Sequence, residues 1–204
     1  MNIRHYVPYG QTVQNPFLSQ LFAEWDRVLR TYEDLYYCYD LPYVYGEQAQ
    51  TFLLGLAAHN LGFHPLAEVS RRKKLKSARA RLDLELQPSA DVWWAIESKH
   101  WYGRIDQKGL NAELRERLRL ACDAAAELTD AYTLKIGIVF ARPFKGTRWP
   151  VDSELDEFRS TIEGIAEDSK SDRTFGVLHW CRRYVAKNSG HTGCPGIAIL
   201  GRFV

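Results

Sequence analysis

Hydrophobic and polar residues alternate strictly over residues 79–86, and a nearly continuous apolar run follows over residues 92–96. Strict alternation is typical of a strand with one buried face, whereas an unbroken apolar run is typical of a strand buried on both faces. Residues 87–91 include a proline and a serine and have the composition of a turn. The pattern therefore predicts a β-hairpin with two charged residues, Glu97 and Lys99, at the exit of its second strand.

The rest of the chain has the periodicity of an α/β protein. Apolar residues recur at helical spacing in four segments, and short apolar runs indicate further strands. The first helix begins at Asn15-Pro16, a capping residue followed by a residue suited to the first turn. We predict helices over residues 15–39, 45–60, 109–130 and from 152 or 153 to 165, and further strands over residues 63–69, 134–141, 174–184 and 196–204.

These elements predict a single domain, residues 1–204, with a mixed central sheet flanked by helices. Its core, about residues 45–141, has the order helix, three strands, helix, strand. Residues 1–40 form an N-terminal helical extension, and residues 150–204 add a helix and two strands.

Composition narrows the class of protein further. Hydrophobic residues make up 46% and charged residues 25% of the 204 residues, which is ordinary for a globular protein. No stretch approaches the roughly 20 apolar residues of a membrane span. The four cysteines are scattered and form no CxxC motif. We therefore expect a reduced, cytoplasmic protein that has no membrane partner.

The hairpin places two acidic residues opposite each other. If its turn is centred on residue 90, Leu86 faces Trp94 and Asp83 faces Glu97. Side chains opposed in this way have Cβ atoms about 4.5–5.5 Å apart, so two like charges there repel each other. A divalent cation between them converts the repulsion into attraction. The hairpin therefore predicts a metal site.

Two neighbouring residues bear on this site. Lys99 lies two positions after Glu97 and points to the same face, which adds an amine beside the metal. Glu85 shares a strand face with Asp83, so the alternation leaves either acid as the ligand. The pairing of the two strands favours Asp83.

The motif formed by Asp83 and Glu97-Ser98-Lys99 resembles the D…(D/E)xK signature of the PD-(D/E)xK, or restriction-endonuclease-like, nuclease superfamily. Leu82 stands where the family often has proline. The predicted order of elements over residues 45–141 is similar to the αβββαβ core of this superfamily. Gly46-Glu47, followed by an apolar helix, resembles the first core helix, in which the corresponding glutamate helps to form the metal site. A carboxylate in a first turn is also stabilised by the helix dipole alone.

The resemblance implies a catalytic set of Asp83, Glu97, Lys99 and Glu47. Mg²⁺, for which Mn²⁺ substitutes, would be bound by Asp83, Glu97, the main-chain carbonyl of Ser98 and Glu47. Lys99 would orient or help to activate the attacking water. Gln48 is an auxiliary candidate through hydrogen bonding.

The implied activity is metal-dependent hydrolysis of phosphodiester bonds, with DNA as the expected partner because the superfamily mostly cuts DNA. The helix after the motif lacks the Gln-x-x-x-Tyr of RecB-like exonucleases, which favours an endonuclease of restriction, defence or mobile-element type. Such enzymes often act as homodimers or with a partner subunit. Two alternatives stay open: a noncatalytic nucleic-acid-binding or protein-interaction module on the same fold, and an RNA-cleaving toxin or effector.

A concentrated positive charge precedes the first strand of the hairpin. The net charge is only +2, yet seven basic residues and no acidic residue lie between positions 71 and 81. Beside a carboxylate cluster we expect this run to contact phosphates, although a solvated loop also explains it. The run consists of Arg71, Arg72, Lys73, Lys74, Lys76, Arg79 and Arg81.

Two further groups have alternative interpretations. Trp101 and Tyr102 follow the motif, and they either line the mouth of the site and stack on a nucleotide or simply pack. Four residues near the C-terminus provide metal-binding side chains but no standard zinc-finger spacing, so a buried strand and an ordinary loop are favoured over a zinc site. These four residues are His179, Cys181, His191 and Cys194.

Overall fold

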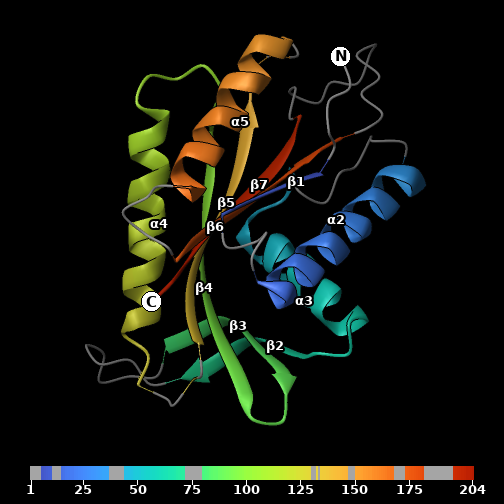
Figure 1. The fold of residues 1–204 in the computed structure, drawn as a ribbon, viewed down its shortest axis with the longest axis vertical. Helices are drawn as coiled ribbons and strands as arrows, with labels where there is room; N and C mark the ends of the chain where they lie inside the picture. Colours follow the sequence, from blue (N-terminus) through green and yellow to red (C-terminus); the bar gives the residue numbers. More distant parts are fainter. Residues whose placement is uncertain are drawn as a thin grey trace.

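A computed structural model describes most of the chain (Figure 1). The described residues are 6–10, 15–36, 44–71, 80–129, 132, 134–146, 150–167, 173–181 and 195–204. In chain order the elements are β1 (Tyr6–Gly10), α2 (Pro16–Tyr36), α3 (Glu47–Asn60), β2 (His64–Arg71), β3 (Ala80–Ser89), β4 (Val92–Arg104), α4 (Leu110–Ala126), β5 (Leu134–Phe144), α5 (Asp152–Ala166), β6 (Thr174–Trp180) and β7 (Gly196–Phe203).

The seven strands form one mixed sheet with the order β1-β6-β7-β5-β4-β3-β2. Strands β4 and β5 are parallel and are joined by the crossover helix α4, whereas all other neighbouring pairs are antiparallel. The predicted α/β fold with a mixed sheet flanked by helices is confirmed. The predicted N-terminal helix, and the C-terminal helix with its two strands, are also confirmed.

Both outer strands of the sheet contain a proline, Pro8 in β1 and Pro65 in β2. Proline lacks an N–H group and is tolerated at a sheet edge, where one side of the strand needs no partner. The predicted strand at residues 63–69 is therefore confirmed as β2. The sequence pattern did not predict β1, because its five residues are too few and too irregular to show a period.

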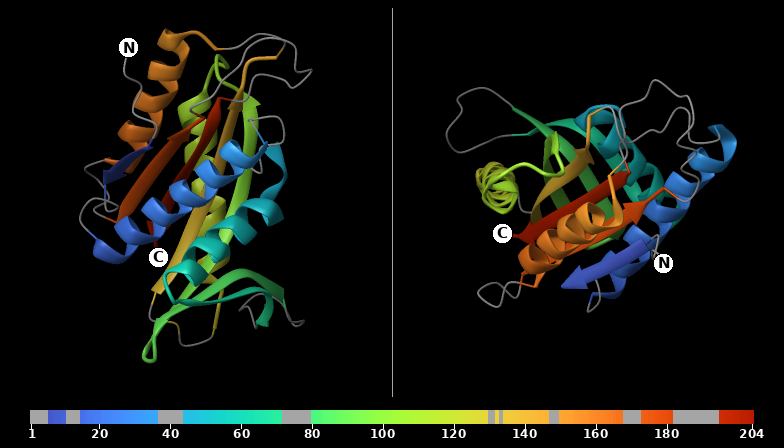
Figure 2. Two further views of the ribbon diagram at one scale, coloured as in Figure 1. Left: turned by 90° about the vertical axis from the view of Figure 1, so that its right-hand side faces the viewer. Right: turned by 90° about the horizontal axis from the view of Figure 1, so that it is seen from above.

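Helices cover both faces of the sheet, with α2 and α3 on one side and α4 and α5 on the other (Figure 2). Helix α2 begins as predicted: the Asn15 side chain accepts hydrogen bonds from the backbone N–H groups of Phe17 and Leu18 at 3.0 and 3.1 Å. Helix α4 ends at Ala126, earlier than predicted. None of the helices in the described ranges has both the length and the apolar character of a transmembrane span.

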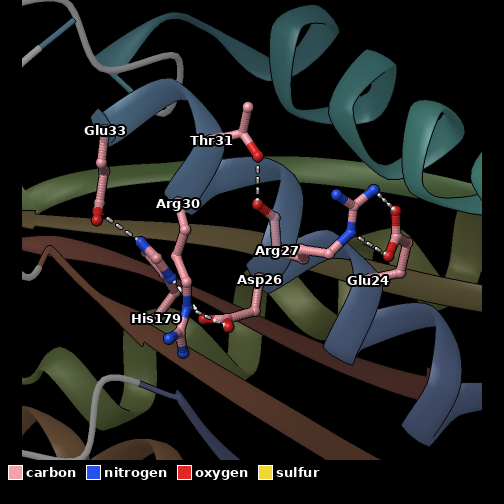
Figure 3. A network of polar contacts seen from close by, with 7 residues as sticks. All are labelled: Glu24, Asp26, Arg27, Arg30, Thr31, Glu33 and His179. Atoms are coloured by element: carbon pink, nitrogen blue, oxygen red, sulfur yellow. Dashed lines mark hydrogen bonds and ion pairs between the residues drawn. The ribbon is translucent and has the colours of Figure 1, made fainter. Parts of the chain in front are cut away.

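A buried polar network joins α2 to β6 (Figure 3). His179 of β6 is completely buried, with Nδ1 2.8 Å from Asp26 Oδ1 and Nε2 2.8 Å from Glu33 Oε1. A charged imidazole donates from both ring nitrogens, which matches the two carboxylate acceptors beside it. Arg30 supplies a second positive charge, with Nε 2.6 Å from Asp26 Oδ2. Two negative and two positive groups therefore balance inside the protein.

This network changes the titration of His179. Burial disfavours the charged imidazole, but the hydrogen bonds and the negative charges of Asp26 and Glu33 outweigh it, so the pKa of His179 lies above its ordinary value. A histidine with a raised pKa stabilises the fold fully below its unfolded pKa of about 6.5, and this contribution is lost as the pH rises through the folded pKa.

We predict that the free energy of unfolding falls as the pH is raised above about 6.5, and that His179→Gln removes this dependence. At pH 6 the substitution should cost about 3–5 kcal/mol, because it leaves buried carboxylates without a cation. Urea denaturation at pH 6 and pH 9 measures both effects. His64→Gln on the exposed side of β2 is the matched control. Equal pH dependence in wild type and His179→Gln would contradict the prediction.

Candidate functional site

Strands β3 and β4 pair in the predicted register and then separate. Leu86 faces Trp94 and Leu84 faces Ile96, as the centred turn requires. The turn itself is tighter than predicted, because β3 continues to Ser89. Along the described strands the ladder ends at the Leu84 pair, one residue before the predicted contact between Asp83 and Glu97. Beyond Ile96, β4 pairs only with β5 in the described part of the chain.

The side chain of Asp83 bonds to β4 at the point where the backbone pairing of β3 and β4 has ended. Its Oδ2 atom accepts a hydrogen bond from the backbone N–H of Ser98 at 2.6 Å and another from the Ser98 hydroxyl at 2.9 Å. Ser98 is fully buried, and a buried N–H group without a partner is costly. Asp83 is therefore fixed at the point where β3 leaves the edge of β4.

Glu47 reaches the same edge from the first turn of α3. Burial and the negative charges of Asp83 and Glu97 raise the pKa of the Glu47 carboxyl above its ordinary value. Attraction to Lys99 and a hydrogen bond from the His100 backbone act in the opposite direction. Because alternate N–H groups of a strand point to the same side, the two carboxylates bind successive edge positions, Ser98 and His100. Glu47 thus lies within electrostatic range of Asp83, Glu97 and Lys99, the other members of the predicted catalytic set.

The amine of Lys99 lies inside this cluster. Its Nζ atom donates a hydrogen bond to the main-chain carbonyl oxygen of Ser98 at 2.6 Å. Thr51 connects the helix to the strand, since its hydroxyl donates to the Glu47 carbonyl at 3.0 Å and lies 3.4 Å from the Ser98 hydroxyl. The sequence interpretation did not include Thr51. Its position four residues after Glu47, on the same helix face, is the feature that identifies it.

Glu85 is held apart from this cluster. Its Oε2 atom accepts hydrogen bonds from Arg71 Nη2 at 2.6 Å and from the Tyr132 hydroxyl at 2.7 Å, and the residue is only 1% exposed. These contacts commit Glu85 to an ion pair, so the geometry favours Asp83 as the acid of the site. They also give Arg71 an internal partner, and its expected phosphate contact stays a prediction.

The expected shared face of Asp83 and Glu85 fails because the alternation breaks inside β3. Leu82 packs with Ala95 and Leu128 on the α4 side, whereas Leu84 packs in the core under α2 and α3. Residues two positions apart normally share a face. The backbone therefore turns at Asp83, and the neighbouring strand β2 is irregular at the same level, where one residue has a φ angle of 55°.

The remaining predicted residues are placed as follows. Arg81 has a side chain 74% exposed, 3.5 Å from Glu68. Gln48 is exposed. Trp101 is 1% exposed and stacks on Phe158 of α5, so it is a core residue and does not line a site. Tyr102 lies on the opposite face of β4 and is 45% exposed. Five basic residues lie outside the described ranges: Arg72, Lys73, Lys74, Lys76 and Arg79.

The geometry of His179 does not favour the zinc alternative. Both of its ring nitrogens bind carboxylates of α2, and Cys181 is buried. His191 and Cys194 lie outside the described residues.

The oxygen donors of the cluster are of the type that Mg²⁺ prefers. In the described ranges, however, no group of three or more His, Cys, Asp and Glu side chains is arranged to hold a metal ion. The Ser98 carbonyl, an expected ligand, is bound by Lys99. Binding of an ion at this position therefore requires Lys99 to release the carbonyl and the carboxylates to converge.

Comparison with known proteins adds no relative. No model of a known protein family matches this chain, and no curated protein or solved structure matches it either.

We predict that Asp83→Ala lowers the free energy of unfolding by about 1–3 kcal/mol, because it leaves the buried Ser98 N–H without its acceptor. Asp83→Asn retains an oxygen acceptor and should cost less. Urea denaturation at pH 7 measures the difference. Asp123→Ala, which removes an exposed ion pair on α4, is the control and should cost about 0–1 kcal/mol. Equal losses in Asp83→Ala and Asp83→Asn would argue against the edge contact.

Proposed function

We propose that this protein is a metal-dependent nuclease that hydrolyses phosphodiester bonds with Glu47, Asp83, Glu97 and Lys99. The observation that carries the proposal is that Asp83 and Lys99 both bond to Ser98 where β3 leaves β4, with Glu47 in electrostatic range of Asp83, Glu97 and Lys99. DNA is the proposed substrate, and an endonuclease of restriction, defence or mobile-element type is the proposed class. The order α3-β2-β3-β4-α4-β5, with β4 and β5 parallel, supports a restriction-endonuclease-like core.

The electrostatics of these acidic residues support the binding of a cation beside them. Burial first, and then the charges of Asp83 and Glu97, raise the pKa of Glu47, so its negative charge is disfavoured in the folded protein. Asp83, Glu97, Glu47 and the Ser98 carbonyl would hold Mg²⁺. A bound Mg²⁺ polarises a scissile phosphate and lowers the pKa of water.

The protein's own side chains would position the substrate and the water and offset the phosphate charge. Asp83 and Glu47 are each fixed by a backbone N–H group of β4, so their carboxylates are oriented before any ligand arrives. Lys99 extends from the same strand, and its ammonium group would offset phosphate charge and orient the attacking water. When Lys99 turns toward a phosphate, it releases the Ser98 carbonyl to which it is now bonded.

The same contacts also favour a second candidate function. Two carboxylates that cap a sheet edge stabilise the fold without any catalysis, and a noncatalytic nucleic-acid-binding module would keep them. Metal-dependent cleavage is the property that separates the two functions.

We predict that the purified protein nicks or linearises supercoiled plasmid in Mg²⁺ or Mn²⁺ and not in EDTA. Lys99→Ala should reduce the rate by about 10²–10⁴-fold, the usual contribution of a positioned proton-transfer or charge-stabilising group. Lys108→Ala, in the exposed turn before α4, is the matched control. Agarose-gel kinetics measure the rates.

Cleavage that persists in EDTA, or in Lys99→Ala, would contradict the assignment. Absence of cleavage of plasmid and of tRNA, together with DNA binding that is equally strong in EDTA, would establish the noncatalytic module instead.

Metal binding has a separate spectroscopic test. We predict that Mg²⁺ lowers the pKa of Glu47, because a cation reverses the effect of the neighbouring negative charges. Carboxyl ¹³C resonances followed by NMR over a pH titration, with and without Mg²⁺, measure the shift. Glu157 on the exposed face of α5 is the internal control and should not respond. A Glu47 titration that Mg²⁺ leaves unchanged would exclude an ion at this site.

A further inference from the structure

Ser98 holds the carboxylate of Asp83 in one orientation. Its backbone N–H group and its hydroxyl both donate to the same oxygen, Asp83 Oδ2, at 2.6 and 2.9 Å. An ionised carboxylate accepts hydrogen bonds and donates none, so the single hydroxyl proton of Ser98 is directed at Asp83. Among the described residues, Oδ1 of the half-buried Asp83 takes part in no hydrogen bond. Oδ1 is therefore the oxygen that remains available to a ligand.

A second hydroxyl group lies behind Ser98. The Thr51 Oγ1 atom is 3.4 Å from Ser98 Oγ and 3.0 Å from the carbonyl oxygen of Glu47. Because the proton of the Ser98 hydroxyl is directed at Asp83, the Ser98 oxygen can only accept from Thr51. The one hydroxyl proton of Thr51 thus has two acceptors, one on β4 and one in the first turn of α3.

The contact between Thr51 and Ser98 is more specific than the bond of Thr51 to its own helix. Thr31 of α2 also donates to the carbonyl oxygen four residues before it, at 3.0 Å, but its side chain is exposed (Figure 3). Thr51 is 6% exposed and Ser98 is completely buried, so bulk water does not compete for their hydroxyl groups. A buried row of polar groups therefore joins Asp83 of β3 to the turn that carries Glu47.

We propose that Ser98 and Thr51 are positioning residues, whose hydroxyl groups hold Asp83 with Oδ1 toward the metal ion and the reacting phosphate. The inference rests on the proposed nuclease function and adds two side chains to it. Ser98 occupies the x position of the (D/E)xK motif, for which the motif specifies no side chain. A carboxylate that is already held in its binding orientation loses less conformational freedom when a cation binds, so removing either hydroxyl group weakens binding.

The test compares variants that lack a hydroxyl group with variants that keep it. Isothermal titration calorimetry with Mg²⁺ alone measures metal affinity, and plasmid cleavage is followed against Mg²⁺ concentration. Ser98→Ala should weaken Mg²⁺ binding about tenfold and move the cleavage curve to correspondingly higher Mg²⁺, the usual effect of removing a group that orients a metal ligand. Thr51→Val should cause a smaller loss, and Thr51→Ser should behave like the wild type. Thr31→Val, which removes only a local helix bond, is the matched control.

A double-mutant cycle tests whether Thr51 acts through Ser98. The protein with both Ser98→Ala and Thr51→Val should bind Mg²⁺ no more weakly than Ser98→Ala alone, because the first change already removes the contact between the two hydroxyl groups. Urea denaturation shows that each variant is folded under the assay conditions. A substitution that only lowers stability would leave the Mg²⁺ affinity of the folded protein unchanged.

Unchanged Mg²⁺ affinity in folded Ser98→Ala, or additive losses in the double variant, would overturn the inference, while Mg²⁺-dependent cleavage by the wild type still supported the nuclease. Equal Mg²⁺ affinity in Thr51→Val and Thr51→Ser would overturn it as well, without any change at Ser98. A wild-type protein that neither binds Mg²⁺ nor cleaves plasmid would overturn both this inference and the proposed function.

Discussion

The candidate site depends on the backbone N–H groups that β4 exposes where β3 leaves it. A sheet edge that is buried beside a helix must find acceptors for these groups, because an unpaired buried N–H is costly. Asp83 binds the first of them, at Ser98, and Glu47 binds the second, at His100. Satisfying the backbone therefore draws two carboxylates to one place, and the exit of β4 adds Glu97 and Lys99 to them.

Acidic groups gather in two parts of the described structure, and their neighbours differ. Between α2 and β6, Asp26 and Glu33 contact His179, and Asp26 also pairs with Arg30. At the edge of β4, burial and the charges of Asp83 and Glu97 raise the pKa of Glu47, while Lys99 lowers it. A carboxylate whose charged form the fold disfavours is a destabilising feature. Such features concentrate at functional sites, which is the electrostatic reason to place a cation there.

The hairpin and its register were predictable because the period of two and the turn composition are local properties. The expected pair of Asp83 and Glu97 was wrong, because the strand pairing ends at Leu84 and the Asp83 side chain binds Ser98. The sequence did not reveal that β3 turns at Asp83. It therefore wrongly placed Glu85 on the same strand face as Asp83. Glu85 is held away from Asp83 by Arg71 and Tyr132, which are distant in sequence. The network of His179 was missed because its partners lie on a helix about 150 residues earlier in the chain.

The strands on either side of the basic run pair with each other. Arg71 ends β2 and Ala80 begins β3, and the two residues pair across the sheet. The five basic residues between them in sequence lie outside the described residues. Among the described residues, the exposed Arg81 precedes Asp83 on β3, and Arg142 of β5 pairs with Tyr102, three positions after Lys99 on β4. A polyanion is attracted to such an arrangement, while the acids at its centre require a cation before a phosphate binds there. Metal binding and nucleic-acid binding should consequently be cooperative.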